Sequence, residues 1–261
     1  MTSETLTATE LRHRIRAGQW RQPTSGAARG FVQANLVMLP KSEAFNFLLF
    51  CVRNPKPCPL LDVLEAGVSE PEIAPGADLR HDLPRYRVYR NGEFAEEVDT
   101  VEEQFNQNMV SFLLGCSFSF ENALQAAGLP IRNIEENKNV SMYITNRACT
   151  PAGPFFAPLV VSMRPMTPEQ AVRAVQITTR FHQTHGAPVH IGDPDQIGIK
   201  DIQQPDFGDP VTILPGEVPV FWACGVTSSL AATSTRLPLV ITHAPGHMFV
   251  SDLRDEDMTL F

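Results

Sequence analysis

The chain has 261 residues, of which 43% are hydrophobic and 19% charged, a balance typical of a globular protein with a sizeable core. Its formal net charge of −8 at pH 7 argues against a nucleic-acid partner, because phosphate binding normally requires a basic face. No segment reaches the roughly 20 apolar residues that a membrane-spanning helix needs.

The N-terminal sequence and the spacing of the cysteines bear on the compartment in which the protein works. Residues 1–18 lack the apolar stretch of a signal peptide. The five cysteines form no C-x-x-C pair, which favours reduced thiols over a disulfide framework or a zinc knuckle. We therefore expect a cytoplasmic protein without a membrane partner.

The N-terminal half carries signals for several helices and one hairpin. Thr7 and Glu10 in "TATE" predict a capping box, and Gly18 ends that helix. The apolar run "KSEAFNFLLFCVR" (41–53) predicts a second helix, and the proline-rich segment 54–85 is expected to be irregular. Asn91-Gly92 predicts a hairpin over 86–98. Two more helices are expected over 100–115 and 119–128.

From about residue 134 the pattern changes to strand, strand, helix, strand. Strands are expected over 139–146, 157–165 and 188–192. Thr167 as cap and Pro168 at the first helical position begin a helix that is expected to end at Gly186.

The segment 218–243 is interpreted as strand, helix, strand with parallel pairing. The predicted fold is α/β with two domains: a discontinuous outer α/β domain (1–133 and 214–261) and a smaller inserted α+β domain (134–213).

Two stretches predict an anion-binding turn at the start of a helix. "GCSFSFE" (115–121) places Cys116, Ser117 and Ser119 where free amides bind anions and lower the pKa of a thiol, with Glu121 in the first turn. "FWACGVTSS" (221–229) repeats the pattern and adds Thr227. The alternative is two ordinary tight turns with buried cysteines.

The stretch "ITHAPGHMFVSD" (241–252) holds His243 and His247, four residues apart. Pro245 and Gly246 break a helix, so the helical zinc spacing does not apply, and no third ligand is nearby. Imidazoles titrate near neutral pH, which favours proton transfer, and Asp252 could orient one ring. A turn with two structural histidines is the alternative. We expect no metal or cofactor.

Other polar residues are weaker candidates for binding a ligand. Asn146, Arg147 and Thr150 follow a predicted strand, and the guanidinium of Arg147 could bind a carboxylate. Arg164 offers the same fork, although a salt bridge is the more common fate of an arginine. His190 lies at a strand end beside an Asp-rich loop and is a candidate acid or base.

Several of these motifs together resemble a known family. "FLLGCSFSFE", "NVSMYITN", "VVSMRP", "GAPVHIGDP", "FWACGVT" and "THAPGHM" are similar to the hydro-lyase family that includes D-glutamate cyclase. The resemblance extends from about residue 30 to the end of the chain. It implies a two-domain α/β fold and loss of water from D-glutamate as its α-amine closes on the side-chain carboxyl, giving 5-oxo-D-proline.

Chemical reasoning then distributes roles among the candidates. His243 and His247 are expected to move protons, while Cys116, Ser117 and Thr227 line an anion pocket and Arg147 holds a carboxylate across the cleft. Cys116 as an acyl-forming nucleophile is a variant of this mechanism. A dehydratase of a different hydroxy acid and a non-catalytic carboxylate-binding protein are the alternatives. The expected partner is a small carboxylate substrate, and the chain could form a homo-oligomer.

Overall fold

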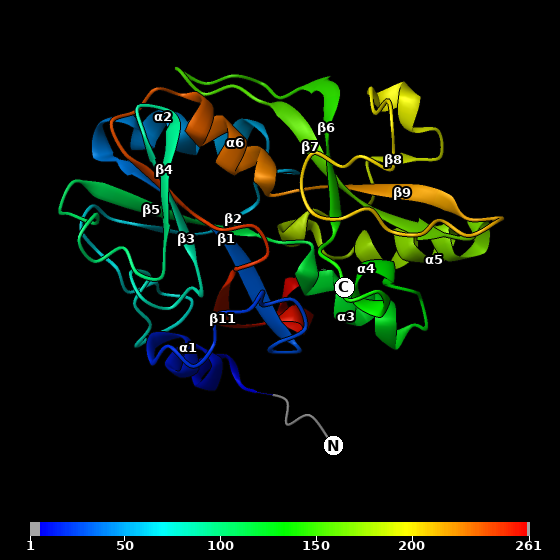
Figure 1. Ribbon diagram of the computed structural model, residues 1–261, viewed down its shortest axis with the longest axis horizontal. Coiled ribbons are helices and arrows are strands. Elements are labelled where there is room, and N and C mark those ends of the chain that lie inside the picture. Colours follow the sequence, from blue (N-terminus) through cyan, green and yellow to red (C-terminus); the bar gives the residue numbers. More distant parts are fainter. Residues whose placement is uncertain (1–5, 260–261) are drawn as a thin grey trace.

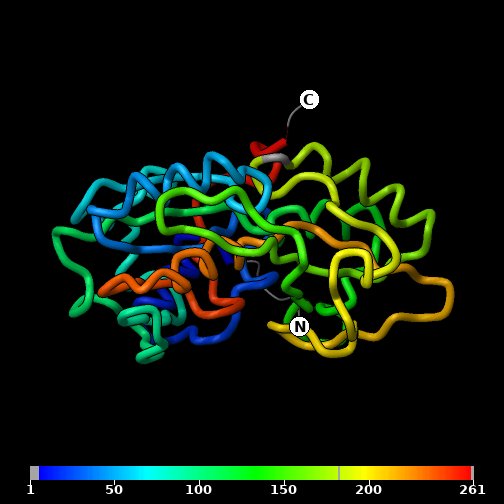
Figure 2. Tube along the Cα trace, turned by 90° about the horizontal axis from the view of Figure 1, so that it is seen from above, coloured from blue at the N-terminus to red at the C-terminus, as the bar shows by residue number. Residues whose placement is uncertain are grey.

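The computed structural model describes residues 6–259, apart from the side chain of His182. Within these residues the chain forms two sheets with helices packed on them (Figure 1). The strand order is β2-β5-β1-β10-β3-β4 in the first sheet, where β11 also pairs with β1, and β6-β7-β9-β8 in the second. Figure 2 shows that the molecule is elongated, with the N-terminal third of the chain at one end and the yellow segment near residue 200 at the other.

The first sheet contains β1 (Phe31–Pro40), β2 (Leu60–Leu64), β3 (Tyr86–Arg90), β4 (Glu93–Val98), β5 (Met109–Gly115), β10 (Val240–His243) and β11 (Phe249–Arg254). The second contains β6 (Ser141–Ala148), β7 (Pro158–Met166), β8 (His190–Ile191) and β9 (Val218–Ala223). The helices are α1 (Ala8–Arg16), α2 (Lys41–Arg53), α3 (Phe118–Ala126), α4 (Arg132–Glu135), α5 (Pro168–Thr178) and α6 (Val226–Ser234). Short 3-10 turns are η1 (His182–Thr184), η2 (Pro194–Ile197) and η3 (Asp255–Met258). No helix within residues 6–259 has the length and apolarity to cross a bilayer.

Elements specified by local contacts lie where the sequence predicts them. Thr7 and Glu10 form the predicted capping box of α1, and α2 covers the predicted residues 41–53. Asn91 and Gly92 both have positive φ, 53° and 83°, as the turn of a two-residue hairpin requires. Thr167 caps α5, but this helix ends at Thr178, eight residues before the expected stop.

The prediction of a helix over 100–115 is wrong. Residues Met109–Gly115 form β5, which lies between β1 and β2 and is buried along its whole length. A strand that is buried on both faces has a continuous apolar sequence, and periodicity alone does not separate it from a buried helix.

The prediction of parallel pairing over 218–243 is also wrong. Every strand pair within residues 6–259 is antiparallel, and β9 belongs to the second sheet whereas β10 belongs to the first. Helix α6 therefore carries the chain from one sheet to the other (Figure 1). Mixed helix and sheet content is confirmed. The boundaries of the two domains stay a prediction. Strand β9 lies outside the range 134–213 but belongs to the second sheet, together with β6, β7 and β8.

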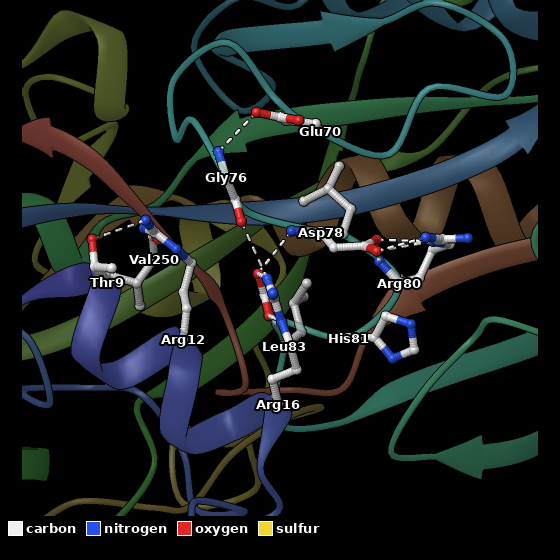
Figure 3. Close-up of polar contacts among 12 residues, drawn as sticks. Thr9, Arg12, Arg16, Glu70, Gly76, Asp78, Arg80, His81, Leu83 and Val250 are labelled. Atoms are coloured by element: carbon white, nitrogen blue, oxygen red, sulfur yellow. Dashed lines mark hydrogen bonds and ion pairs between the residues drawn. The ribbon is translucent and has the colours of Figure 1, made fainter.

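Helix α1 is attached to the first sheet by two arginines. Figure 3 shows Arg12 and Arg16 extending from α1 toward Val250 and toward the segment of Gly76 and Asp78. Arg12 donates to the carbonyl of Val250 at 2.8 Å, and Arg16 binds both carboxylate oxygens of the fully buried Asp82 at 2.8 and 2.5 Å. These bonds hold the helix against β11 and the 76–83 loop.

Candidate active site

Three turns that the sequence singles out meet at the middle of β1. The side-chain Nδ2 of Asn35 donates to the carbonyl of Gly115, at the end of β5, at 2.9 Å. Gly225, at the start of α6, lies so close to the Asn35 amide that a Cβ atom on it would overlap that side chain. The backbone N–H of Leu36 donates to Nδ1 of His243 at 3.2 Å. Two consecutive residues of β1 thus position all three turns.

The cysteines of the two helix-start turns share a buried apolar cluster with Met248. Burial raises the pKa of the Cys116 thiol far above its usual value, and this effect outweighs the opposing hydrogen bond from the Phe118 backbone. Burial also raises the pKa of Cys224, to about 11. The expectation of a lowered thiol pKa at Cys116 is wrong, because desolvation of the thiolate dominates the field of the helix start.

A buried ion pair lies behind the Cys116 turn. Arg164 is fully buried and donates from Nε and Nη2 to Oε1 of Glu121, and also from Nη2 to Ser117 Oγ at 3.2 Å. Its guanidinium lies 5.4 and 5.5 Å from the ring centroids of Phe120 and Trp222. The fork that the sequence assigned to a carboxylate therefore binds a carboxylate of the protein itself and ties α3 to β7.

Both histidines hold Nδ1 against the main chain, but against different backbone groups. Nδ1 of His243 faces the main chain of Leu36, at 3.2 Å from its N–H and 3.4 Å from its carbonyl. In the tautomer that accepts the shorter bond, Nε2 carries the proton. In His247 the partner of Nδ1 is the carbonyl of Pro245 at 2.9 Å, which only accepts, so Nδ1 carries a proton. Nε2 of this ring has no hydrogen-bond partner within residues 6–259. Burial lowers the pKa of His243 to about 4, which keeps its ring neutral near pH 7.

Two predicted site hydroxyls are used within the protein framework. Ser119 Oγ accepts from the backbone N–H of Gln33 at 3.3 Å, and Thr227 Oγ accepts from that of Val160 at 2.9 Å. Both residues are buried. Their bonds join α3 to β1 and α6 to β7, so their hydroxyls position the turns around the site.

The remaining predicted residues have partners elsewhere. Asn146, Arg147 and Thr150 are exposed at the end of β6, where Arg147 donates to the Val189 carbonyl at 3.1 Å. Nε2 of His190 lies 2.7 Å from the carbonyl of Asp193. The expectation that Asp252 orients a histidine is wrong, because its carboxylate binds Arg12 at 2.9 and 3.1 Å. No group of three or more His, Cys, Asp or Glu side chains within the described residues could hold a metal ion.

Two hollows border the loop that contains the histidines. A cavity of about 70 Å³, here called the His243 cavity, lies between β3, β10 and α6, and its walls include Arg87, Ser229 and His243. A larger hollow of about 530 Å³ is lined by Pro23 and Asn139, which both approach Gly246. The larger hollow could hold a small acid, whereas the His243 cavity has room for only part of one.

Three residues near the site were not identified from the sequence. Asn35 was detectable as a polar residue that alternates with Gln33 inside the otherwise apolar β1, which is unusual for a buried strand. Arg87 and Ser229 carry no comparable signal, because only the pairing of β3 with β10 and the placement of α6 bring them to His243.

Comparisons with known proteins place the chain in a family. The model of the family described as "D-glutamate cyclase" matches residues 110–252, which is more than half of the chain and includes α3, β7, α6 and the histidine loop. A protein named "Putative hydro-lyase" from Syntrophobacter fumaroxidans is 58% identical over 95% of this chain and 96% of its own length. One from Geobacillus kaustophilus with a name of the same kind is 60% identical over 97% of both chains.

Among solved structures, a nitrogen repressor-like protein from Methanococcus jannaschii is similar over 94% of this chain and 98% of its own, with 10% identity. Its TM-score of 0.36 is too low to support an inference about the fold. The family match and the high identity of the relatives support a lyase-type enzyme. On these grounds the chain belongs to the D-glutamate cyclase family.

Proposed function

We propose that this protein catalyses the dehydrating cyclisation of D-glutamate, or of a closely related small acid, to 5-oxo-D-proline. Family membership supports hydro-lyase chemistry. The single observation that carries the proposal is that both histidines hold Nδ1 against the main chain, His243 at Leu36 and His247 at Pro245. We assign the shorter Leu36 bond to the N–H, so that His243 offers an Nε2–H donor and neutral His247 offers an Nε2 lone pair. A cyclisation that loses water needs one group of each kind.

The reaction moves protons without releasing any. The α-ammonium loses two protons, its nitrogen bonds to the side-chain carboxyl carbon, and one C–O bond breaks. The departing oxygen takes up both protons and leaves as water. In this scheme Nε2 of His247 is the base that accepts protons from the amine and returns them to the oxygen, a role worth about 10²–10⁴-fold in rate.

His243 has a different role because its ring is neutral. A neutral imidazole with Nε2–H stabilises developing negative charge on the carboxyl oxygen as a hydrogen-bond donor and need not transfer its proton. The low pKa of about 4 that burial produces suits this task, since the ring does not become cationic at neutral pH. The raised pKa of Cys116 favours direct attack by the amine over a route through a thioester.

The test is to incubate the purified protein with D-glutamate and to follow loss of water by mass spectrometry, with L-glutamate and small hydroxy acids in parallel. His247→Asn keeps a donor for the Pro245 carbonyl but lacks the base, so turnover should fall by about 10²–10⁴-fold. Its thermal midpoint should stay close to that of the wild type, because His247 is only half buried.

Absence of 5-oxoproline from D-glutamate contradicts the proposal, as does full turnover by the His247→Asn variant. Water loss from a hydroxy acid instead would identify a different dehydratase. Binding of D-glutamate without turnover would identify a carboxylate-binding protein.

A further inference from the structure

The His243 cavity combines the cation of Arg87, the buried hydroxyl of Ser229 and largely apolar walls. Arg87 on β3 lies opposite Thr242 on β10 in the sheet register, so these two side chains share a face of the sheet. Arg87 and His243 both line the cavity, and the charge of Arg87 adds to the effect of burial in lowering the pKa of His243. Ser229 and Leu230 enter from α6, and Phe207 closes the cavity from the chain that follows η2. The composition is that of a small-molecule site, with a few polar groups on an apolar background.

The guanidinium of Arg87 is positioned but not saturated. Its Nε donates to Glu97 at 3.0 Å, and the group lies 5.8 Å from the ring centroid of Phe94, so the side chain is held from one side. Neither Nη atom has a hydrogen-bond partner within the described residues. Those nitrogens carry the paired N–H groups that bind a carboxylate in a fork.

Ser229 supplies a second donor. Its Oγ is buried and has no hydrogen-bond partner among residues 6–259, whereas Oγ of the preceding Ser228 binds the Gly225 carbonyl at 2.7 Å. A buried hydroxyl without a partner is costly, by about 1–3 kcal/mol, unless something else in the cavity binds it. This is an observation independent of Arg87, and it indicates a polar ligand.

The volume determines which part of a ligand fits. A cavity of about 70 Å³ holds roughly five to seven water-sized groups at 10–15 Å³ each. That is enough for a carboxylate and its neighbouring carbon atoms but less than the whole of D-glutamate. We propose that the His243 cavity is a subsite for one carboxylate of a small acid, held by Arg87 and Ser229, with the adjoining methylene groups against Leu230 and Phe207.

This inference rests on the proposed function for the identity of the ligand, and it assigns the carboxylate to Arg87 in place of Arg147. A phosphate is a poorer match, because the cavity offers a single arginine whose charge is partly balanced by Glu97. The position of His243 beside the subsite would bring the reacting part of the acid to its Nε2–H.

Binding measured by calorimetry tests the subsite without relying on turnover. The probes are D-glutamate, glutarate and 5-oxo-D-proline, and the proteins are the wild type, Arg87→Gln, Arg87→Lys, Ser229→Ala and the control Arg90→Gln. Arg90 is exposed on the same strand, so its loss removes a positive charge near the site but no proposed contact.

For at least one probe, Arg87→Gln should raise Kd by about ten- to a hundred-fold and Ser229→Ala by about three- to ten-fold. Arg87→Lys should retain part of the affinity because the charge remains but the fork is lost. Arg90→Gln should bind like the wild type. Equal affinity in Arg87→Gln and wild type overturns the subsite, and so does a wild type that binds none of the three acids.

The two proposals fail in different ways. If the wild type converts D-glutamate and Arg87→Gln keeps the same KM, the subsite is wrong and the proposed function stands. If the wild type binds these acids through Arg87 but releases no water from D-glutamate, the subsite stands and the proposed function is wrong. Should Arg87→Gln fold poorly, Ser229→Ala carries the same test, since it removes one hydroxyl and changes no charge.

Discussion

The amide of Asn35 occupies the space that a Cβ atom on Gly225 would fill, while the same amide donates to the carbonyl of Gly115. One side chain of β1 thereby fixes the distance between the ends of β5 and β9, which belong to different sheets. The glycine is required by this contact and not by its backbone, whose φ of −63° suits any residue.

Gly225→Ala should destabilise the protein by about 2–4 kcal/mol, because the new methyl group displaces Asn35 from its buried hydrogen bond. Urea unfolding measures this cost. In a double-mutant cycle, the combined Asn35→Ala and Gly225→Ala variant should lose at least about 1 kcal/mol less than the sum of the single variants. Additive losses would show that the two side chains do not compete for one space.

Arg164→Met should lower the free energy of unfolding by about 3–5 kcal/mol, since it leaves the carboxylate of Glu121 buried without its cation. The matched control is Arg173→Met on the exposed face of α5, where the arginine only donates to the Ala127 carbonyl. That control should change stability by less than about 1 kcal/mol. Equal losses in the two variants would contradict the importance of the buried pair.

The protein should lose stability as the pH falls from about 6.5 to 4. Burial lowers the pKa of His243 and of His185 to about 4, below the ordinary value of 6.5, so the unfolded state takes up protons first on acidification. Each histidine contributes stability that is present above pH 6.5 and decreases toward pH 4, by up to about 3 kcal/mol.

His243→Asn keeps an oxygen that can accept the Leu36 N–H and removes the titrating ring. Unfolding free energies at pH 7 and pH 5 should therefore differ less in this variant than in the wild type. An identical difference in both proteins would show that His243 does not titrate with a lowered pKa.

Asp82→Asn should cost about 2 kcal/mol by weakening the attachment of α1. The carboxylate is fully buried and accepts from both Arg16 and the backbone N–H of Asp78 at 2.7 Å. The side chain of Arg16 is 40% exposed, which places the expected loss below that of a fully buried pair. Asp99→Asn is the control, because the Asp99 side chain is 48% exposed although it forms ion pairs. This substitution should lower the free energy of unfolding by less than about 1 kcal/mol. A comparable loss of unfolding free energy in the two variants would mean that burial of Asp82 does not strengthen its ion pair with Arg16.

The sequence by itself determined those features whose causes lie within a few residues. The capping box of Thr7, the helix cap at Thr167 and the Asn91-Gly92 turn depend on hydrogen bonds and backbone preferences between near neighbours. They can therefore be recognised in the sequence, and they occur as predicted. The ordered motifs also identified the family, because they record a local sequence pattern and not a geometry.

Only the tertiary structure decided what depends on pairing and burial. Met109–Gly115 is a strand because β1 and β2 flank it, and Arg164 binds Glu121, a partner 43 residues away in the sequence. Cys116 has a raised pKa because the fold removes it from water. Long-range contacts and desolvation are properties of the folded chain. A pattern of neighbouring residues does not specify which distant side chain a residue will contact, or how far the residue will be shielded from water.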